Sequence, residues 1–316
     1  MPSLRLRLVD EHEVLPAFAN PHALMARAVT RGRCELLPAV AWRASTWHRG
    51  CFGPRAGSTA LAWNPDPVVP CRAVWLFRIR SAHYIPSFGA VISSGGEVMQ
   101  LSIDEARFVT PDLAALPGVR KQDDDMVLDL AGASVPTLAK AAVTLSWGGI
   151  LNYGHFLLDC VTGASLLRDT PGLGGHSRVF PRLQDWQRRH LELAEVAPLE
   201  LADPIYHVSD LVFTSCMAHF LGTPNVNYRR LRERQLRNHR ATGETPTRIY
   251  VSRRGRVNRQ FVSENALEDR LRAAGFAVIL PEELPVDQQI RSFHQSNRCR
   301  RCKGEDEAQT ARRVGV

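Results

Sequence analysis

The sequence has few lysines, no long apolar run and no paired-cysteine framework. Only Lys121, Lys140 and Lys303 are lysines, although the formal net charge is +8. No stretch reaches the roughly 18 consecutive apolar residues of a transmembrane helix, and the first residues lack the apolar core of a secretory signal. The seven cysteines are odd in number and scattered, which argues against a disulfide framework. We therefore expect a cytoplasmic protein in a reducing setting.

The composition is that of a globular protein large enough for about two domains. The chain has 316 residues, of which 44% are hydrophobic and 23% charged. Its basic surface could attract nucleic acid, anionic lipid or a phosphorylated small molecule. A coding sequence that uses arginine where others use lysine explains the same excess, so charge alone does not choose a partner.

Apolar periodicity predicts an α/β fold from residue 73 onward, after a poorly defined segment 1–72. The linker-like segment 241–247 divides an N-terminal α/β domain, 73–240, from a partial C-terminal domain, 248–296. Alternation of strands and helices after the linker favours a parallel, doubly wound sheet. The strands are expected at 73–80, 90–93, 97–103, 142–147, 175–180, 205–213, 248–253 and 276–280, with a hairpin turn at Gly95-Gly96, and the helices at 152–168, 182–196, 227–240, 263–274 and 285–296.

Three polar residues at the start of the helix 152–168 could carry acid/base chemistry. Asn152, His155 and Asp159 are three and four residues apart, which puts them on one helical face. A histidine beside a carboxylate can take a proton from a substrate hydroxyl. The alternative is purely structural: Asn152 caps the helix and His155 only hydrogen-bonds to Asp159.

A basic cluster follows the strand 248–253. Ser252, Arg253, Arg254 and Arg259 stand at or beyond its carboxyl end, where parallel sheets bind ligands. Arginine forks match phosphate oxygens, so a diphosphate site is one interpretation. A solvated basic loop is the other.

Two further patterns give weak metal-site signals. Asp123, Asp124 and Asp125 are adjacent in a charged loop with no flanking strand, which favours a solvated acidic loop over a cation site. Cys299 and Cys302 have the spacing of a zinc half-site, but only His294 is near as a further ligand. We therefore expect no metal and no cofactor.

Two of these segments resemble the family 61 glycosyltransferases, which include capsular-polysaccharide-type enzymes. NYGHFLLD (152–159) is similar to an Asn-Tyr-x-His-aromatic-Leu-x-Asp stretch of that family. YVSRR (250–254), Arg259 with Glu264, GF (275–276), PEEL (281–284) and DQQI (287–290) follow a second pattern in the same order and spacing. The resemblance covers roughly residues 80–296. Gly154 and Ser263 stand where the family more often has an aromatic residue and an asparagine.

The resemblance implies a GT-B architecture of two Rossmann-like domains, and inverting transfer of a sugar from a nucleotide-sugar donor to a glycan or lipid-linked glycan. It implies donor binding in the C-terminal domain. His155 or Asp159 would then be the general base, and Asn152 and Tyr153 would line the acceptor side. Nucleic acid is not expected, whereas peripheral membrane association fits a lipid-linked acceptor. The donor-binding residues carried over from the family are Ser252, Arg253, Arg254, Arg259 and Glu264.

The segment 297–316 departs from the family pattern. It reads NRCRRCKGEDEAQTARRVGV, without the apolar strand and glycine-rich loop that the family has there. Only two strands are expected in the C-terminal domain, and the chain looks truncated or frameshifted after about residue 296. The expectation is a family member that is inactive because part of its donor domain is missing. The alternative function is a non-catalytic protein whose basic surface binds nucleic acid or another anionic polymer.

Overall fold

The computed structural model describes two compact units, Met1–Leu231 and Arg232–Val316. The division falls within helix α6 (Val226–Asn238). No helix of the described residues is long and apolar enough to cross a membrane. The described residues are 3–9, 25–30, 33–38, 46–48, 68–70, 74, 76–99, 113–144, 152–214, 226–240, 242–243, 246–255, 263–295 and 298–301.

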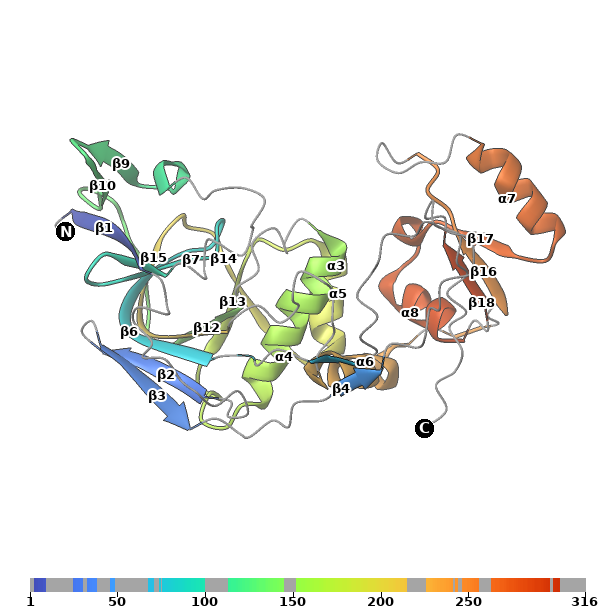
Figure 1. Cartoon of the computed structure of the whole chain (residues 1–316), viewed down its shortest axis with the longest axis horizontal. Helices are drawn as coiled ribbons and strands as arrows, with labels where there is room; N and C mark the ends of the chain where they lie inside the picture. Colours follow the sequence, from blue (N-terminus) through green and yellow to red (C-terminus); the bar gives the residue numbers. More distant parts are fainter. Residues whose placement is uncertain are drawn as a thin grey trace. The chain divides into compact units, whose positions relative to one another are not determined.

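A large mixed sheet organises the first unit (Figure 1). Its main path, in order across the sheet, is β14-β13-β12-β15-β6-β7-β8-β1-β10-β9, with β2, β3 and β11 attached to the side. The expected mixed α/β fold is thus confirmed. The strands of this sheet are β1 Leu4–Val9, β2 Met25–Thr30, β3 Arg33–Pro38, β6 Leu76–Ile85, β7 Ala90–Ser93, β8 Glu97–Met99, β9 Val119–Gln122, β10 Asp125–Leu128, β11 Thr137–Leu138, β12 Ala141–Thr144, β13 Ser177–Pro181, β14 Pro198–Leu201 and β15 Tyr206–Thr214.

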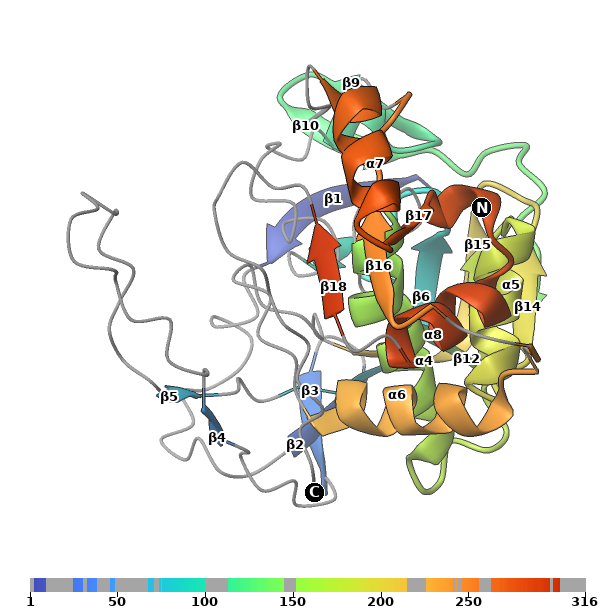
Figure 2. The same cartoon turned by 90° about the vertical axis from the view of Figure 1, so that its right-hand side faces the viewer.

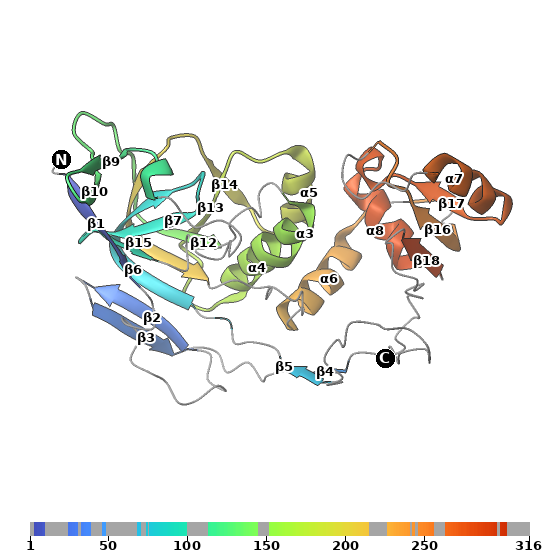
Figure 3. The same ribbon diagram turned by 45° about the horizontal axis from the view of Figure 1, so that its top comes forward.

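Four neighbouring strands of this sheet have the topology of a nucleotide-binding half-domain. β12, β13, β14 and β15 are parallel and lie in the order third, second, first, fourth. The helical segment Tyr153–Asp169 connects β12 to β13, and α5 (Asp185–Leu193) connects β13 to β14. Figure 3 shows both connections on the same side of the sheet. In such sheets, ligands bind beyond the carboxyl ends of the strands where the order reverses, here between β12 and β15.

The rest of the sheet is largely antiparallel and is built from hairpins. The expected turn at Gly95-Gly96 is confirmed: it joins β7 to β8, and Gly96 has φ +87 with Arg5 O where a Cβ would lie. The charged segment 121–125 spans the end of β9, a turn at Asp123 and Asp124, and the start of β10, and both strands were missed in the sequence. Strands from the first 72 residues join this sheet, while β4 (Thr46–His48) pairs only with β5 (Val68–Pro70).

A buried charge cluster lies inside the first unit, on β6, β15 and the residue before β13. The guanidinium of Arg78 donates from Nε to Oδ1 of Asp210 at 2.6 Å and also contacts Oδ2. Arg80 lies 2.6 Å from Oδ2 and His176 3.3 Å from the same atom. Burial alone would raise the pKa of Asp210, but the hydrogen bonds and charge of Arg78, with the charge of Arg80, hold it below its ordinary value. Asp210 is therefore a buried, fully ionised anchor.

The second unit contains a small parallel sheet in the order β17-β16-β18. The parallel pairing expected from the sequence is confirmed, but the expectation of only two strands is wrong. The third strand, β18, has the sequence RCRR and pairs with β16 through its backbone, which needs no apolar side chains. The elements of this unit are β16 Arg248–Val251, α7 Glu264–Ala273, β17 Ala277–Ile279, α8 Val286–Gln295 and β18 Arg298–Arg301.

The second unit also has a strand order that reverses. α7 leads from β16 to β17, and α8 returns the chain across β16 to β18. Figure 2 shows β16 and β18 side by side and pointing the same way. Gly275, with φ +79, ends α7 in the left-handed conformation: Phe276 N–H donates to Leu271 O and Gly275 N–H to Arg272 O. Ser263 is the N-cap of α7 by position but makes no side-chain capping bond.

Candidate functional site

The first candidate site lies at the start of the helical segment that follows β12. Asn152 adopts an extended conformation, and its Oδ1 accepts hydrogen bonds from the backbone N–H groups of Gly154 (2.9 Å) and His155 (3.2 Å). Asn152 is therefore the helix N-cap that its position in the sequence predicts. Because the segment follows the first parallel strand, its start belongs to the edge of the sheet where ligands bind.

The segment is not a uniform α-helix. α3 (Tyr153–His155) leads into a π-helix, Phe156–Val161, and then α4, Thr162–Asp169. Both the backbone N–H and the side-chain Oγ1 of Thr162 donate to Leu157 O, five residues earlier. π-Helical turns inside α-helices are frequent at functional sites, because they redirect the side chains around them.

The π-helix holds a histidine–aspartate pair. His155 Nδ1 lies 3.1 Å from Asp159 Oδ2. The two side chains have opposite surroundings: that of Asp159 is 1% exposed and that of His155 is 60% exposed. A substrate in solvent can therefore reach the imidazole but not the carboxylate. When Asp159 accepts the Nδ1 proton, Nε2 keeps a lone pair that can accept a proton.

Aromatic side chains surround Tyr153, which lies two residues before His155. The ring of Tyr153 lies 5.2 Å from that of Trp186 and 5.6 Å from that of His190. Its hydroxyl is 3.1 Å from His190 Nε2, and burial of the hydroxyl, with a contribution from Tyr228, raises the pKa of Tyr153 to about 12. Tyr153 is thus a neutral phenol at physiological pH.

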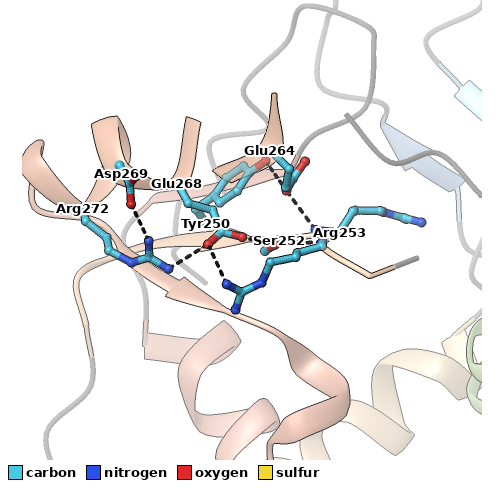
Figure 4. Close-up of polar contacts among 8 residues, drawn as sticks. Tyr250, Ser252, Arg253, Glu264, Glu268, Asp269 and Arg272 are labelled. Carbon is cyan, nitrogen blue, oxygen red and sulfur yellow. Dashed lines mark hydrogen bonds and ion pairs between the residues drawn. The ribbon is translucent and has the colours of Figure 1, made fainter. Parts of the chain in front are cut away.

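The second candidate site lies beyond the carboxyl end of β16, and its residues are shown in Figure 4. Glu264 Oε1 accepts a hydrogen bond from the Tyr250 hydroxyl at 2.8 Å and another from the backbone N–H of Arg253 at 2.9 Å. Ser252 Oγ donates to Glu268 Oε1 at 2.5 Å and accepts from the backbone N–H of Arg254 at 3.0 Å. The first turn of α7 therefore fixes the chain as it leaves β16.

This geometry changes the role of two residues assigned to donor binding. Ser252 and Glu264 are buried, at 3% and 2% exposure, and their hydrogen bonds lie within the unit. They position residues 252–255, which we call the arginine loop, whereas Arg253 and Arg254 within it reach the surface. Glu264 Oε2 has no hydrogen-bond partner among the described residues. Arg259 lies outside the described residues.

Arg253 and Arg254 differ in their electrostatic surroundings. Arg254 Nη1 lies 3.8 Å from Glu268 Oε2, the oxygen that also accepts from Arg272 Nη2 at 2.7 Å. Within the described part of the chain, Arg253 has no carboxylate partner for its guanidinium. In Figure 4 it points away from the carboxylates of α7. Among the described residues that directly follow β16, Arg253 is consequently the cation without a carboxylate partner.

Glu268 connects the loop to α7. Burial alone would raise the pKa of its carboxyl, but hydrogen bonds from Ser252 and Arg272 and the charges of Arg254 and Arg272 hold that pKa below its usual 4.5. A carboxyl with a lower pKa in the folded chain stabilises the fold above its unfolded pKa, and this stabilisation is lost as the pH falls through the folded value.

We therefore expect the free energy of unfolding to fall as the pH is lowered below about 4.5, partly through protonation of Glu268. Glu268→Gln should weaken this dependence, since the amide does not titrate. Urea unfolding followed across the acidic range measures it. Asp269→Asn, at the next residue of α7 and 76% exposed, is the matched control. An unchanged slope in Glu268→Gln would contradict the assignment.

The weaker sequence signals gain no support as sites. Asp123 and Asp124 form an exposed hairpin turn, and Asp125 contacts Arg5. Cys302 lies outside the described residues. No group of three or more His, Cys, Asp or Glu side chains in the described part of the chain could hold a metal ion. The helix expected at 227–240 is α6, and its exposed arginines include Arg229, Arg232 and Arg237.

Sequence reasoning missed Trp186 and His190 beside the first site and Tyr250, Glu268 and Arg272 beside the second. A signal for Glu268 existed: Glu264 and Glu268 are four residues apart, so both lie on the same face of α7. No comparable signal pointed to Trp186, because its approach to Tyr153 depends on how α5 packs against the π-helix.

Comparison with known families gives one match, a family model described as Glycosyltransferase 61, over residues 153–302. No curated protein matches the chain. The matched segment begins at Tyr153, includes the His155–Asp159 pair and the arginine loop, and ends just after β18. Members of this family act on a sugar donor and a glycan acceptor. Through residues 153–302, the chain belongs to the glycosyltransferase 61 family.

Proposed function

We propose that the protein transfers a sugar from a nucleotide-sugar donor to a hydroxyl group of a glycan, with inversion at the anomeric carbon. The observation that carries this proposal is the His155–Asp159 pair, which combines an exposed imidazole with a buried carboxylate at 3.1 Å. An inverting transfer needs one base for the attacking hydroxyl, and this arrangement supplies one. We assign the base to His155 and a positioning role to Asp159.

The proposed reaction moves one proton and exchanges one bond. His155 Nε2 takes the proton of the acceptor hydroxyl while that oxygen attacks the anomeric carbon from the face opposite the leaving group. The bond from the anomeric carbon to the phosphate oxygen breaks, and the nucleoside diphosphate leaves with its electron pair. Asp159 holds the imidazole in the required tautomer and stabilises it once it is protonated.

We place the donor diphosphate at the loop after β16. Arginine recognises phosphate oxygens in pairs, and Arg253 is the arginine that, among the described residues directly after β16, has no carboxylate partner. The position also suits a ligand, because the strand order of the small sheet reverses beside β16. The buried contacts of Glu264 and Glu268 hold Ser252 and the backbone of Arg253 in place, so these residues need little ordering when the diphosphate binds.

The proposed architecture is GT-B, with one nucleotide-binding-type sheet in each unit. Its support is the parallel segment β14-β13-β12-β15 in the first unit and β17-β16-β18 in the second. In each, the residues proposed to act follow the first strand of the parallel set, β12 or β16. We further propose a cytoplasmic enzyme of the capsular-polysaccharide type, acting on a glycan or lipid-linked glycan without a cofactor.

The function is tested by nucleotide-dependent stabilisation and by transfer. The purified chain is screened with UDP, GDP, CMP and ADP, and a ligand at about 100 times its dissociation constant should add about 2.7 kcal/mol to the free energy of unfolding. The matching nucleotide sugars are then tested for transfer to a glycan panel. Binding without transfer would support the expectation of an inactive family member. Retention on a polyanion, without nucleotide binding, would favour the non-catalytic alternative.

We expect Arg253→Ala to weaken nucleotide binding much more than Arg254→Ala. Loss of a charged hydrogen bond of about 1.5–3 kcal/mol corresponds to a roughly 10- to 100-fold rise in the dissociation constant. Arg254 already lies 3.8 Å from Glu268, and its loss should cost at most about fivefold, as for an exposed ion pair. Calorimetric titration of both variants measures the difference. Equal losses would contradict the assignment of the diphosphate to Arg253.

A further inference from the structure

Tyr153 is an exposed aromatic side chain that is held in a fixed position. It is 43% exposed, and Leu199 and Phe293 are the other exposed large apolar side chains in the described part of the chain. Its hydroxyl end is anchored by the contact with His190 Nε2 at 3.1 Å, and His190 itself is buried. An ordinary surface tyrosine needs no such anchor. Here the anchor fixes an aromatic ring on a residue that stays 43% exposed.

Trp186 extends this surface from a second helix. Its ring is 5.2 Å from that of Tyr153, with an angle of 33° between the ring planes. Beneath them, the buried ring of Phe156 meets Trp186 edge-on at 5.1 Å, and Trp186 Nε1 donates to Gln184 Oε1 at 2.5 Å. Two large rings are therefore fixed by contacts on the protein side before any ligand arrives. We call Tyr153 and Trp186 the aromatic platform.

The chemistry of the platform fits a sugar ring. A pyranose presents axial C–H groups on its flat faces and hydroxyl groups around its rim. The faces of aromatic rings carry negative charge density, which attracts the positive ends of C–H bonds. Polar groups lie beside the platform: Asn152 uses Oδ1 as a cap, which leaves its amide nitrogen to donate to a hydroxyl. Because the rings are already ordered, binding costs little side-chain entropy.

We propose that Tyr153 and Trp186 form a stacking subsite for a sugar ring of the acceptor glycan, adjacent to the ring that carries the reacting hydroxyl. This inference rests on the proposed function, because it takes the ligand to be the acceptor. Tyr153 and His155 are two residues apart on a helical turn, so their side chains diverge. A sugar stacked on Tyr153 therefore cannot present its hydroxyl to His155, and the platform binds the neighbouring sugar.

The choice of a glycan over a nucleotide base follows from the charges nearby. A base that stacked on the platform would bring its diphosphate to the same turn. On α5, Asp185 and Arg188 lie next to Trp186 in the sequence, and Arg188 is held by Asp185 and Glu200. This arginine is therefore already paired with carboxylates, unlike Arg253. A neutral sugar needs no such cation.

The test compares binding of mono- and disaccharides to the full chain. The probes are glucose, galactose, mannose, xylose and N-acetylglucosamine, with disaccharides of each, followed by saturation-transfer NMR. Wild-type protein should bind at least one disaccharide more tightly than its monosaccharide. Trp186→Ala and Tyr153→Ala should each raise that dissociation constant at least about tenfold. Phe293→Ala, which removes another aromatic ring exposed to a similar extent (40%), should leave it unchanged.

Each result decides the question. Tyr153→Phe keeps the ring and loses the hydroxyl contact with His190, so it should bind better than Tyr153→Ala and guards against loss of folding. Unchanged binding in Trp186→Ala, no binding of any sugar to the wild type, or competition for the platform by a nucleotide would overturn the proposal. Nucleotide binding and transfer with an unchanged KM in Trp186→Ala would overturn the platform but not the function. Sugar binding to the platform without any nucleotide binding would overturn the proposed function but not the platform.

Discussion

Replacing His155 by alanine should lower the rate of sugar transfer by about 10²- to 10⁴-fold, with little change in nucleotide binding. That range is what a general base contributes when it takes a proton in the transition state. The imidazole is 60% exposed, and the buried carboxylate of Asp159 has a further interaction besides its contact with His155, so the substitution should cost little stability. The measurement is nucleotide release with the donor that the stabilisation screen identifies.

Asp159→Asn separates the base from the residue that orients it. An asparagine amide at this position can donate to Nδ1, which would turn the imidazole so that Nε2 carries the proton and cannot accept another. A fall of similar size in kcat, with a displaced pH–rate profile, is the expected outcome. If Asp159→Asn were inactive and His155→Ala retained most of its activity, the carboxylate itself would be the base.

The control for these variants is His294→Ala. His294 is exposed in the last turn of α8, in the other unit of the chain, so its removal tests whether loss of any exposed histidine affects the assay. Thermal unfolding of all three variants should agree with the wild type within a few degrees. A loss of activity in His294→Ala equal to that in His155→Ala would remove the argument for a specific base.

The helix at the first site shows what a sequence can and cannot predict. Spacing placed Asn152, His155 and Asp159 on one face and made Asn152 a cap, and both expectations depend only on local geometry. The π-helix was not predictable, because apolar periodicity hardly changes when one residue is added to a turn. Burial then decided the chemistry: the sequence left His155 and Asp159 equivalent, whereas the fold covers only the carboxylate.

At the second site, the sequence predicted the positions of the residues but not the direction of their side chains. Ser252 and Glu264 have the chemistry of ligand-binding residues, and the place of Ser252 at the end of a strand and of Glu264 at the start of a helix was correctly predicted. Side-chain direction was not, because it follows from how α7 packs against β16, a contact between segments about a dozen residues apart. The strand β18 was missed for a related reason. RCRR has no apolar pattern, and only the neighbouring β16 makes it a strand.

The largest effect on stability is expected from Asp210→Asn, which should lower the free energy of unfolding by about 3–5 kcal/mol. Removing this carboxylate leaves the guanidinium of Arg78 inside the first unit without its charged partner. Arg80 and His176, which lie near Oδ2, lose the same negative charge. Urea unfolding at neutral pH measures the loss. Asp129→Asn breaks the more accessible pair with Arg120 and should change little.

A double replacement distinguishes the cost of an unpaired charge from the value of the pair itself. Asp210→Leu with Arg78→Met removes both charges and keeps similar volume, so it should recover most of the stability lost in Asp210→Asn. Recovery would mean that the pair contributes little net stability and that the loss in the single variant is the burial of an unpaired Arg78. Failure to recover would mean that Arg80 and His176 also depend on the carboxylate. The cluster would then hold β6, β15 and the start of β13 in register, and with them the strand β12 that precedes the His155 site.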